Sequence, residues 1–119
     1  MRYMLLSYDD EKYWTSVGED KLAEARVEAV RLTHELDARG QYLLAAPLKW
    51  SSEAASVRIR DGQLTVTDGP FAETREVLGG FYLIDVENLD EAIAIAGRHP
   101  GARVGTVEIR PVLELPGLP

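Results

Sequence analysis

The alternation of apolar and polar residues divides the chain into strands and helices in the order β-α-β, hairpin, β-α-β. An apolar run at residues 3–8 predicts a first strand covered on both faces, and residues 42–46 predict a second, ended by Pro47. Asp61-Gly62 separates the alternating runs 57–60 and 64–67, which is a strong hairpin signal, and one face of this hairpin is expected to be wet. Residues 79–86 and 106–110 predict the last two strands.

Two stretches carry apolar residues at helical spacing. Ser16 and Glu19 predict a capping box at the start of the first helix, after a polar connector at 9–14, and Gly40 predicts its end. Asn88 caps the second helix, which Pro100 ends. The apolar stripes consist of Leu22, Ala25, Ala29, Leu32 and Leu36 in the first helix and of Leu89, Ala92, Ile93 and Ala96 in the second.

This order predicts an α+β, ferredoxin-like fold: two βαβ units with an inserted β-hairpin, and an antiparallel sheet with helices on one face. We expect a single domain over residues 1–119, with a tail at 112–119. The other face of the sheet is expected to carry Tyr3, Leu5, Phe81 and Leu83 in one register. An uncovered apolar face is a ligand floor or an oligomer interface, so we predict a homodimer with cavities between two facing sheets.

The amino-acid composition limits which classes of partner the protein is expected to bind. The 119 residues include 20 acids and 13 bases, for a net charge of −7, which argues against nucleic acid and against anionic membrane surfaces. The chain has no cysteine, so it forms no disulfide and has no thiol nucleophile or thiolate metal site. We find no signal peptide pattern and no apolar segment near the roughly 20 residues of a membrane span, and we therefore expect a cytoplasmic protein.

The candidate chemistry gathers between Asp68 and Glu76. A carboxylate at a strand end beside an apolar floor would have a raised pKa, so Asp68 is the candidate general base or acid and Glu73 the second carboxylate. A purely structural interpretation stays open, in which Asp68 accepts backbone N–H groups to fix the turn and Glu73 pairs with an arginine.

The candidate ligand-binding residues surround these acids. Tyr3 and Tyr82 could donate to a substrate oxygen or simply fill the core, and Arg75 could hold a carboxylate or phosphate or remain a solvated charge. The remaining candidates, which shape the turn and wall the pocket, are Gly69, Pro70 and Phe71. Two histidines without ligand spacing predict no metal site, and we expect no cofactor. Gly79-Gly80 is expected to permit a bulge or a close backbone approach.

The motif Asp68-Gly69-Pro70-Phe71 resembles the DGPF branch of the YCII-related family, as do the stretches 78–84 and 107–112. The resemblance implies a ferredoxin-like, dimeric α/β barrel fold with a cleft lined by the motif. It implies no assigned reaction. Some members resemble accessory proteins encoded beside extracytoplasmic-function sigma factors, and the wider superfamily includes lactone isomerases, cofactor-free monooxygenases and binding proteins.

The resemblance also implies a His–Asp dyad, for which this chain offers no obvious histidine. His34 falls on the solvent face of the first helix, and His99 lies at the end of the second. Two main hypotheses follow. The first is a cofactor-free small-molecule enzyme, with isomerase- or lyase-like proton transfer by Asp68 and Glu73 at the dimer. The second is a non-enzymatic ligand-binding or accessory module linked to sigma-factor-type regulation. A purely structural dimer is a third possibility.

Overall fold

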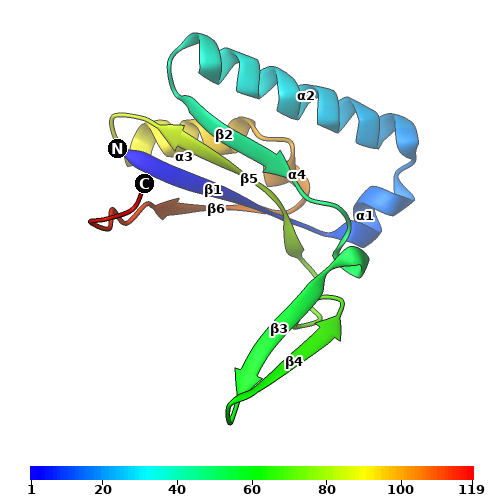
Figure 1. Cartoon of the computed structure of the whole chain (residues 1–119). Helices are drawn as coiled ribbons and strands as arrows, with labels where there is room; N and C mark the ends of the chain where they lie inside the picture. Colours follow the sequence, from blue (N-terminus) through cyan, green and yellow to red (C-terminus); the bar gives the residue numbers. More distant parts are fainter.

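In the computed structural model, which describes all residues 1–119, four strands form one antiparallel sheet in the order β2-β5-β1-β6 (Figure 1). These strands are β1 (Arg2–Asp9), β2 (Tyr42–Pro47), β5 (Val77–Asp85) and β6 (Thr106–Pro111). The strands β1 and β5 lie at the centre of the sheet, between the edge strands β2 and β6, as two βαβ units require. The predicted α+β architecture is confirmed, and the sheet of the single chain is open rather than a closed barrel.

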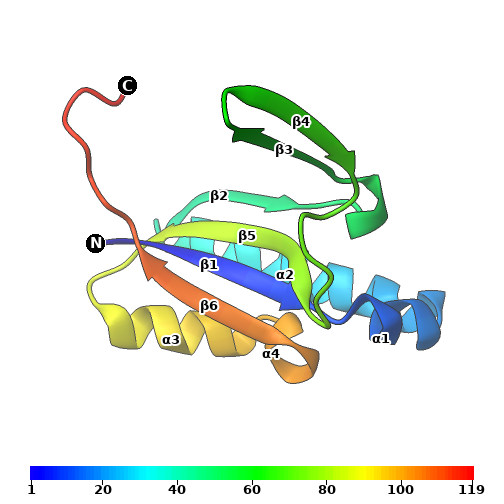
Figure 2. The ribbon, with the colours of Figure 1, turned by 90° about the horizontal axis from the view of Figure 1, so that it is seen from below.

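All four α-helices lie on the same side of the sheet, as Figure 2 shows. They are α1 (Glu11–Ser16), which lies at the end of the sheet, α2 (Glu19–Ala38), α3 (Leu89–Arg98) and α4 (Gly101–Val104). The short 3-10 turn η1 (Ser51–Glu53) lies apart from them, at the base of the hairpin. The helix α2 ends just before Gly40, as predicted. The helix α3 begins at its predicted cap, Asn88. The face without helices is called the open face below.

The start of the first long helix was predicted wrongly. The expected connector contains α1, because the Asp10 carboxylate accepts from the backbone N–H groups of Lys12 and Tyr13 and so caps a new helix. Ser16 is the last residue of α1, and its hydroxyl donates backward to the Tyr13 carbonyl at 2.8 Å. The capping box therefore does not form, and α2 begins after Gly18 without a side-chain cap.

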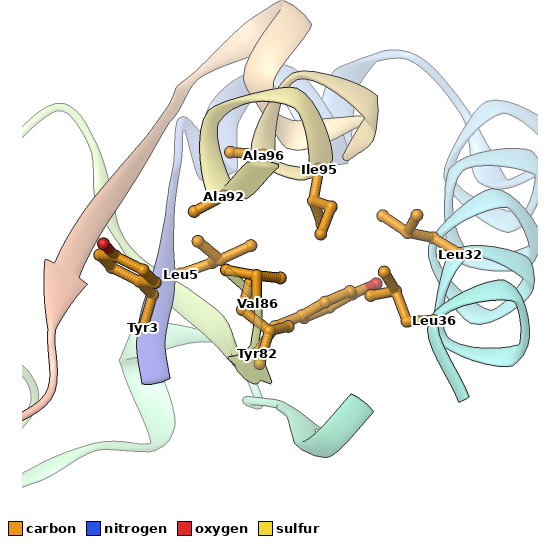
Figure 3. Packing of buried hydrophobic residues seen from close by; sticks show 10 residues of the cluster. Tyr3, Leu5, Leu32, Leu36, Tyr82, Val86, Ala92, Ile95 and Ala96 are labelled. Atoms are coloured by element: carbon orange, nitrogen blue, oxygen red, sulfur yellow. The ribbon is translucent and has the colours of Figure 1, made fainter. Parts of the chain in front are cut away.

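The core lies between the helices and the sheet (Figure 3). Leu32 and Leu36 of α2 are buried, as their stripe predicts. In α3 the predicted stripe is rotated: Leu89 and Ile93 are exposed, and Ile95 is buried instead. Two alanines, Ala92 and Ala96, are compatible with either stripe, and the true one continues through Ile95 toward the end of the helix.

The assignment of sheet faces was wrong for Tyr3 and Leu5 and correct for Phe81 and Leu83. Leu5 is opposite Tyr82, and Tyr3 is opposite Ile84, so all four lie on the helix-covered face. Leu6 is opposite Phe81 and Met4 opposite Leu83, and these four half-buried side chains form the open face. Strands that are apolar on both faces show no alternation, and a one-residue error in register moves every side chain to the other face.

The predicted hairpin forms, as β3 (Ala55–Arg60) and β4 (Gln63–Asp68) in a separate two-stranded sheet. Asp61 and Gly62 both have positive φ, the conformation of the two-residue turn that an Asp-Gly pair favours. The expectation of a single wet face is wrong, because the hairpin projects away from the sheet on the open-face side (Figures 1 and 2). Every residue of the two strands is exposed except the half-buried Ser56.

Candidate functional site

A cavity of about 720 Å³ lies between α2 and the sheet. Small side chains leave this space open, because Ala25 and Ala29 of α2 face Ala45 and Gly80 on the strands. Close packing would fill such a gap if larger residues stood there. The remaining walls are mostly apolar and include Leu5, Leu22, Val30, Leu48 and Val107.

One end of the cavity is polar and is built by Ser7, Asp9 and His99. Ser7 is buried, and its hydroxyl donates to Asp9 Oδ1 at 3.4 Å. Burial raises the pKa of Asp9, and the charges of Glu11 and Glu76 raise it further, while hydrogen bonds from Trp14 and Ser7 oppose them. The polar end therefore holds a carboxyl group that retains its proton to higher pH than an ordinary aspartate.

Two glycines make room for this polar end. A Cβ on Gly79 would lie 1.8 Å from Asp9 Oδ2, so the carboxylate occupies the place of the missing side chain. A Cβ on Gly101 would lie 2.6 Å from Ser7 Oγ and 2.9 Å from His99 Nδ1. The register of β1 and β5 shifts at this point, so the bulge and the close approach expected from Gly79-Gly80 are confirmed.

His99 is held as a neutral imidazole. The Gly101 backbone N–H donates to His99 Nδ1 at 3.0 Å, so the neutral ring carries its proton on Nε2. Burial lowers the pKa of His99, the charge of Glu28 opposes this, and that of Arg103 adds to it. The ring packs edge-on against Tyr82, with centroids 5.2 Å apart.

The two tyrosines predicted to bind ligand have different surroundings. Tyr82 lines the cavity and points toward α2 (Figure 3), where its hydroxyl donates to the Ala29 carbonyl at 2.6 Å. Burial, with a smaller contribution from Tyr42, raises the pKa of Tyr82 to about 12, so it stays protonated and joins α2 to β5. Tyr3 is buried outside the cavity lining, with its hydroxyl 3.8 Å from Met1 Sδ.

The rim of the cavity is formed by α1 and the segment around η1. Glu11 joins them, because its carboxylate accepts from both the backbone N–H and the hydroxyl of Ser51. Trp14 and Trp50 add aromatic surface to the lining. The rim is therefore fixed by side-chain hydrogen bonds between segments far apart in the sequence.

The Asp68 loop, residues 68–76, meets this rim only at its far end. Arg75 Nε lies 3.5 Å from Oδ2 of Asp10, next to Asp9 in the chain, and Glu76 contributes to the raised Asp9 pKa. Asp68 and Glu73 are exposed and are not part of the cavity lining. Glu73 forms no ion pair, so the pairing with an arginine that the structural interpretation allowed is absent, and Arg75 pairs with Asp10 instead. Arg58 stacks 6.0 Å from the ring centroid of the exposed Phe71.

The turn at the start of this loop is fixed by backbone groups. Gly69 has a φ of 93°, in the left-handed region that favours glycine, and no helical turn follows Pro70. Backbone groups fix the turn, because Gly69 N–H donates to the Ala54 carbonyl and the Ser56 hydroxyl donates to the Gly69 carbonyl. The Asp68 carboxylate accepts no hydrogen bond here, so neither its structural nor its chemical role is assigned by its contacts.

The polar end of the cavity was missed by the sequence interpretation. Asp9 was treated as part of a connector, and His99 as the end of a helix. A signal for His99 existed: the buried stripe of α3, Ala92, Ile95 and Ala96, reaches residue 99 at the next i+3 step. His34 is exposed, as predicted.

No group of three or more acidic or histidine side chains is arranged to bind a metal ion. None of the helices combines the length and the apolar character needed to cross a bilayer.

Comparison with known proteins gives one consistent result. The family model described as the YCII-related domain matches residues 1–116. An uncharacterized protein from Rhizobium meliloti (strain 1021) is 35% identical over 114 residues, which cover 94% of this chain and 92% of that protein. The family match includes all the strands and the Asp68 loop.

Proposed function

The chain belongs to the YCII-related family, and from this premise we propose that the protein is an enzyme that binds a small, largely apolar molecule in its cavity and transfers a proton with Asp9. One observation carries the proposal. A half-buried carboxyl group with a raised pKa stands at the polar end of a cavity of about 720 Å³ whose walls are mainly apolar. Such a cavity has the size and character of small-molecule sites, and a perturbed acid within it is a candidate for proton transfer.

The reaction class is proton abstraction next to a carbonyl group, as in isomerisation. The Asp9 carboxylate takes the proton, the C–H electron pair moves into an enolate, and the same proton returns to another carbon. No electron is gained or lost overall, so the chain's own groups are sufficient. The protonated Nε2 of His99 at the same end of the cavity is a suitable donor to the enolate oxygen.

The geometry favours Asp9 over Asp68 as the base. Asp9 is partly buried in the cavity, whereas Asp68 is exposed on the hairpin. A proton-transfer role for Asp68 and Glu73, together with ligand contacts from Gly69, Pro70, Phe71 and Arg75, remains the sequence-based prediction. It requires a second copy of the chain to cover them. We propose such a homodimer, with the open faces of two sheets packed together.

The test is exchange of substrate protons with solvent. Enolisable lactones and 2-oxo esters are incubated with the protein in D₂O, and loss of the α-proton signal is followed by ¹H NMR. Asp9→Asn should slow exchange by about 100-fold or more, the usual contribution of a general base. Asp68→Asn, the matched change on the exposed carboxylate, should leave the rate unchanged. Unchanged exchange in Asp9→Asn, or loss only in Asp68→Asn, would refute the role of Asp9.

The alternative is a non-enzymatic ligand-binding module, including an accessory protein of a sigma-factor-type regulator. Its support is that the Tyr82 hydroxyl and His99 Nδ1 are already used inside the chain. Saturable binding of a compound that shows no exchange and no turnover, with equal affinity for the parent and Asp9→Asn, would favour this alternative.

A further inference from the structure

The hairpin presents an apolar face to solvent. Val57 is opposite Val66, and Ile59 is opposite Leu64, so the four side chains lie together on one face. Their exposed fractions are 61%, 62%, 64% and 63%, respectively. The other face carries the polar pairs Ser56 with Thr67, Arg58 with Thr65 and Arg60 with Gln63. An apolar face opposite a polar face is the pattern of a β-hairpin that packs with its apolar side against another surface.

Nothing within the chain covers this face. The hairpin belongs to no larger sheet and projects away from the rest of the molecule (Figure 1). Its base is attached through the hydrogen bonds of Gly69 to Ala54 and Ser56. A two-stranded sheet without a packed face is only marginally stable in water. Clusters of exposed apolar residues on one face are a sign of an interaction site.

The second apolar surface is the open face of the sheet. Met4, Leu6, Phe81 and Leu83 are half-buried there, and Leu44 at the edge is 49% exposed. Figure 2 shows the hairpin on this side of the sheet, opposite the helices. The two surfaces therefore bound the same space, and one body placed in that space would contact both.

We propose that the hairpin is an arm that holds a second copy of the chain, and that the apolar face of each hairpin packs against the partner whose sheet lies over the open face. Because both surfaces belong to one chain, a twofold axis matches each surface with its complement in the other copy. This inference rests on the homodimer of the proposed function and assigns the contact that stabilises it.

Charge and area also favour a second copy. The chain carries a net charge of −7, which makes two copies repel each other, but residues 55–68 contain two arginines and two aspartates and are neutral. The neutral hairpin can therefore approach a second acidic copy without net charge repulsion. Stable interfaces bury about 800 Å² on each partner. The side chains of the open face are half-buried, and the largely exposed hairpin adds apolar area to the surface that a partner would cover.

The proposal also places Asp68 in the contact. Asp68 is opposite Ala55, and this pair lies on the same face as Val57 and Val66, next to the base of the hairpin. A partner that covers the apolar face would therefore cover Asp68 as well. The Asp68 carboxylate is therefore exposed in the single chain and becomes covered when two chains associate.

The test compares two neighbouring substitutions that add the same charge. Leu64→Asp alters the apolar face, and Thr65→Asp alters the polar face of the same strand. The dimer dissociation constant is measured by sedimentation velocity, and circular dichroism checks the fold. Leu64→Asp should weaken the dimer by about 100-fold or more, whereas Thr65→Asp should change it less than about threefold. Both residues are exposed, so the core should fold in both variants.

A second measurement locates the contact directly. The chain has no cysteine, so Ile59→Cys provides a unique site for a benzophenone maleimide. Labelled and isotopically heavy unlabelled chains are mixed and irradiated, and crosslinks are mapped by mass spectrometry. Crosslinks from residue 59 to the heavy copy support the arm, and crosslinks confined to the light chain overturn it.

The outcomes separate the arm from the dimer. If Leu64→Asp dimerises as tightly as the parent, the arm is refuted while the homodimer stands. A specific contact is expected to be populated at a chain concentration of about 100 μM. If the parent chain remains a monomer at that concentration, both the arm and the homodimer are refuted. The proton-transfer proposal for Asp9 is still tested by its own assay.

Discussion

Replacing Gly79 with alanine places a methyl group where the Asp9 carboxylate now lies. The new Cβ would be 1.8 Å from Asp9 Oδ2 and 2.8 Å from Asp9 Cγ, but an ordinary 3.5 Å from Asp9 Cβ. The carboxylate must therefore move by roughly 1 Å, while the backbone of both strands can stay in place. Gly79 does not have positive φ, so alanine strains the backbone little.

The size of the effect follows from the contacts that move. Forcing the Asp9 side chain off its rotamer costs about 0.5–1.5 kcal/mol, and losing the hydrogen bond from Ser7 costs about 0.5–1.5 kcal/mol. The lower entropy of the unfolded alanine chain returns about 0.4–1 kcal/mol. We therefore expect Gly79→Ala to lower the free energy of unfolding by about 1–2 kcal/mol.

A double-mutant cycle with Asp9→Ala identifies the cause. In that background the carboxylate is absent, so Gly79→Ala should be neutral or stabilising by about 0.5 kcal/mol. Free energies of unfolding are measured by urea titration with circular dichroism, at one fixed protein concentration because association adds to stability. An equal loss in both backgrounds would show that Gly79 makes room for something other than Asp9, and would refute this reasoning.

Two other predictions concern the same region. Burial raises the pKa of Asp9, so the folded chain binds this proton more tightly than the unfolded chain, and the stability contributed by this group falls as the pH rises from about 3.8 through the folded value. Asp9→Asn should therefore raise the urea midpoint at pH 7 more than at pH 4, and an equal change at both would contradict the shift. Tyr82→Phe removes the hydrogen bond to Ala29 and should cost about 1 kcal/mol of unfolding free energy. Tyr13→Phe, at an exposed site, should cost less and serves as the urea-titration control.

Much of the fold was predictable because strong local signals agreed with the final topology. The alternating runs around Asp61-Gly62, the cap at Asn88 and the order of strands and helices all led to the ferredoxin-like sheet. The helix α1 was not predictable by periodicity, because its 6 residues span fewer than two turns. The faces of Tyr3 and Leu5 could not be read from a strand that is apolar on both sides, since only the pairing with β5 and the packing of the helices decide them.

The candidate site was harder to predict from the sequence than the fold. The Asp68 loop stands out because its residue types are unusual together, whereas Asp9 looks like an ordinary acid after a strand. What distinguishes Asp9 is the missing side chain of Gly79, which lies far away in the sequence and meets it only through the pairing of β1 with β5. Burial of this kind is a property of the tertiary structure. A local motif cannot report it.

The walls of the cavity have a consequence for how related proteins could differ. The space exists because Ala25, Ala29 and Ala45 are small, and none of these residues contacts the hydrogen bond between Ser7 and Asp9. Exchanging one alanine for valine would shrink the space by two methyl groups and leave the polar end as it is. Under the proposed function, the residues that select the molecule and the residues that act on it are thus different ones, and selection can change the first in single steps while keeping the second.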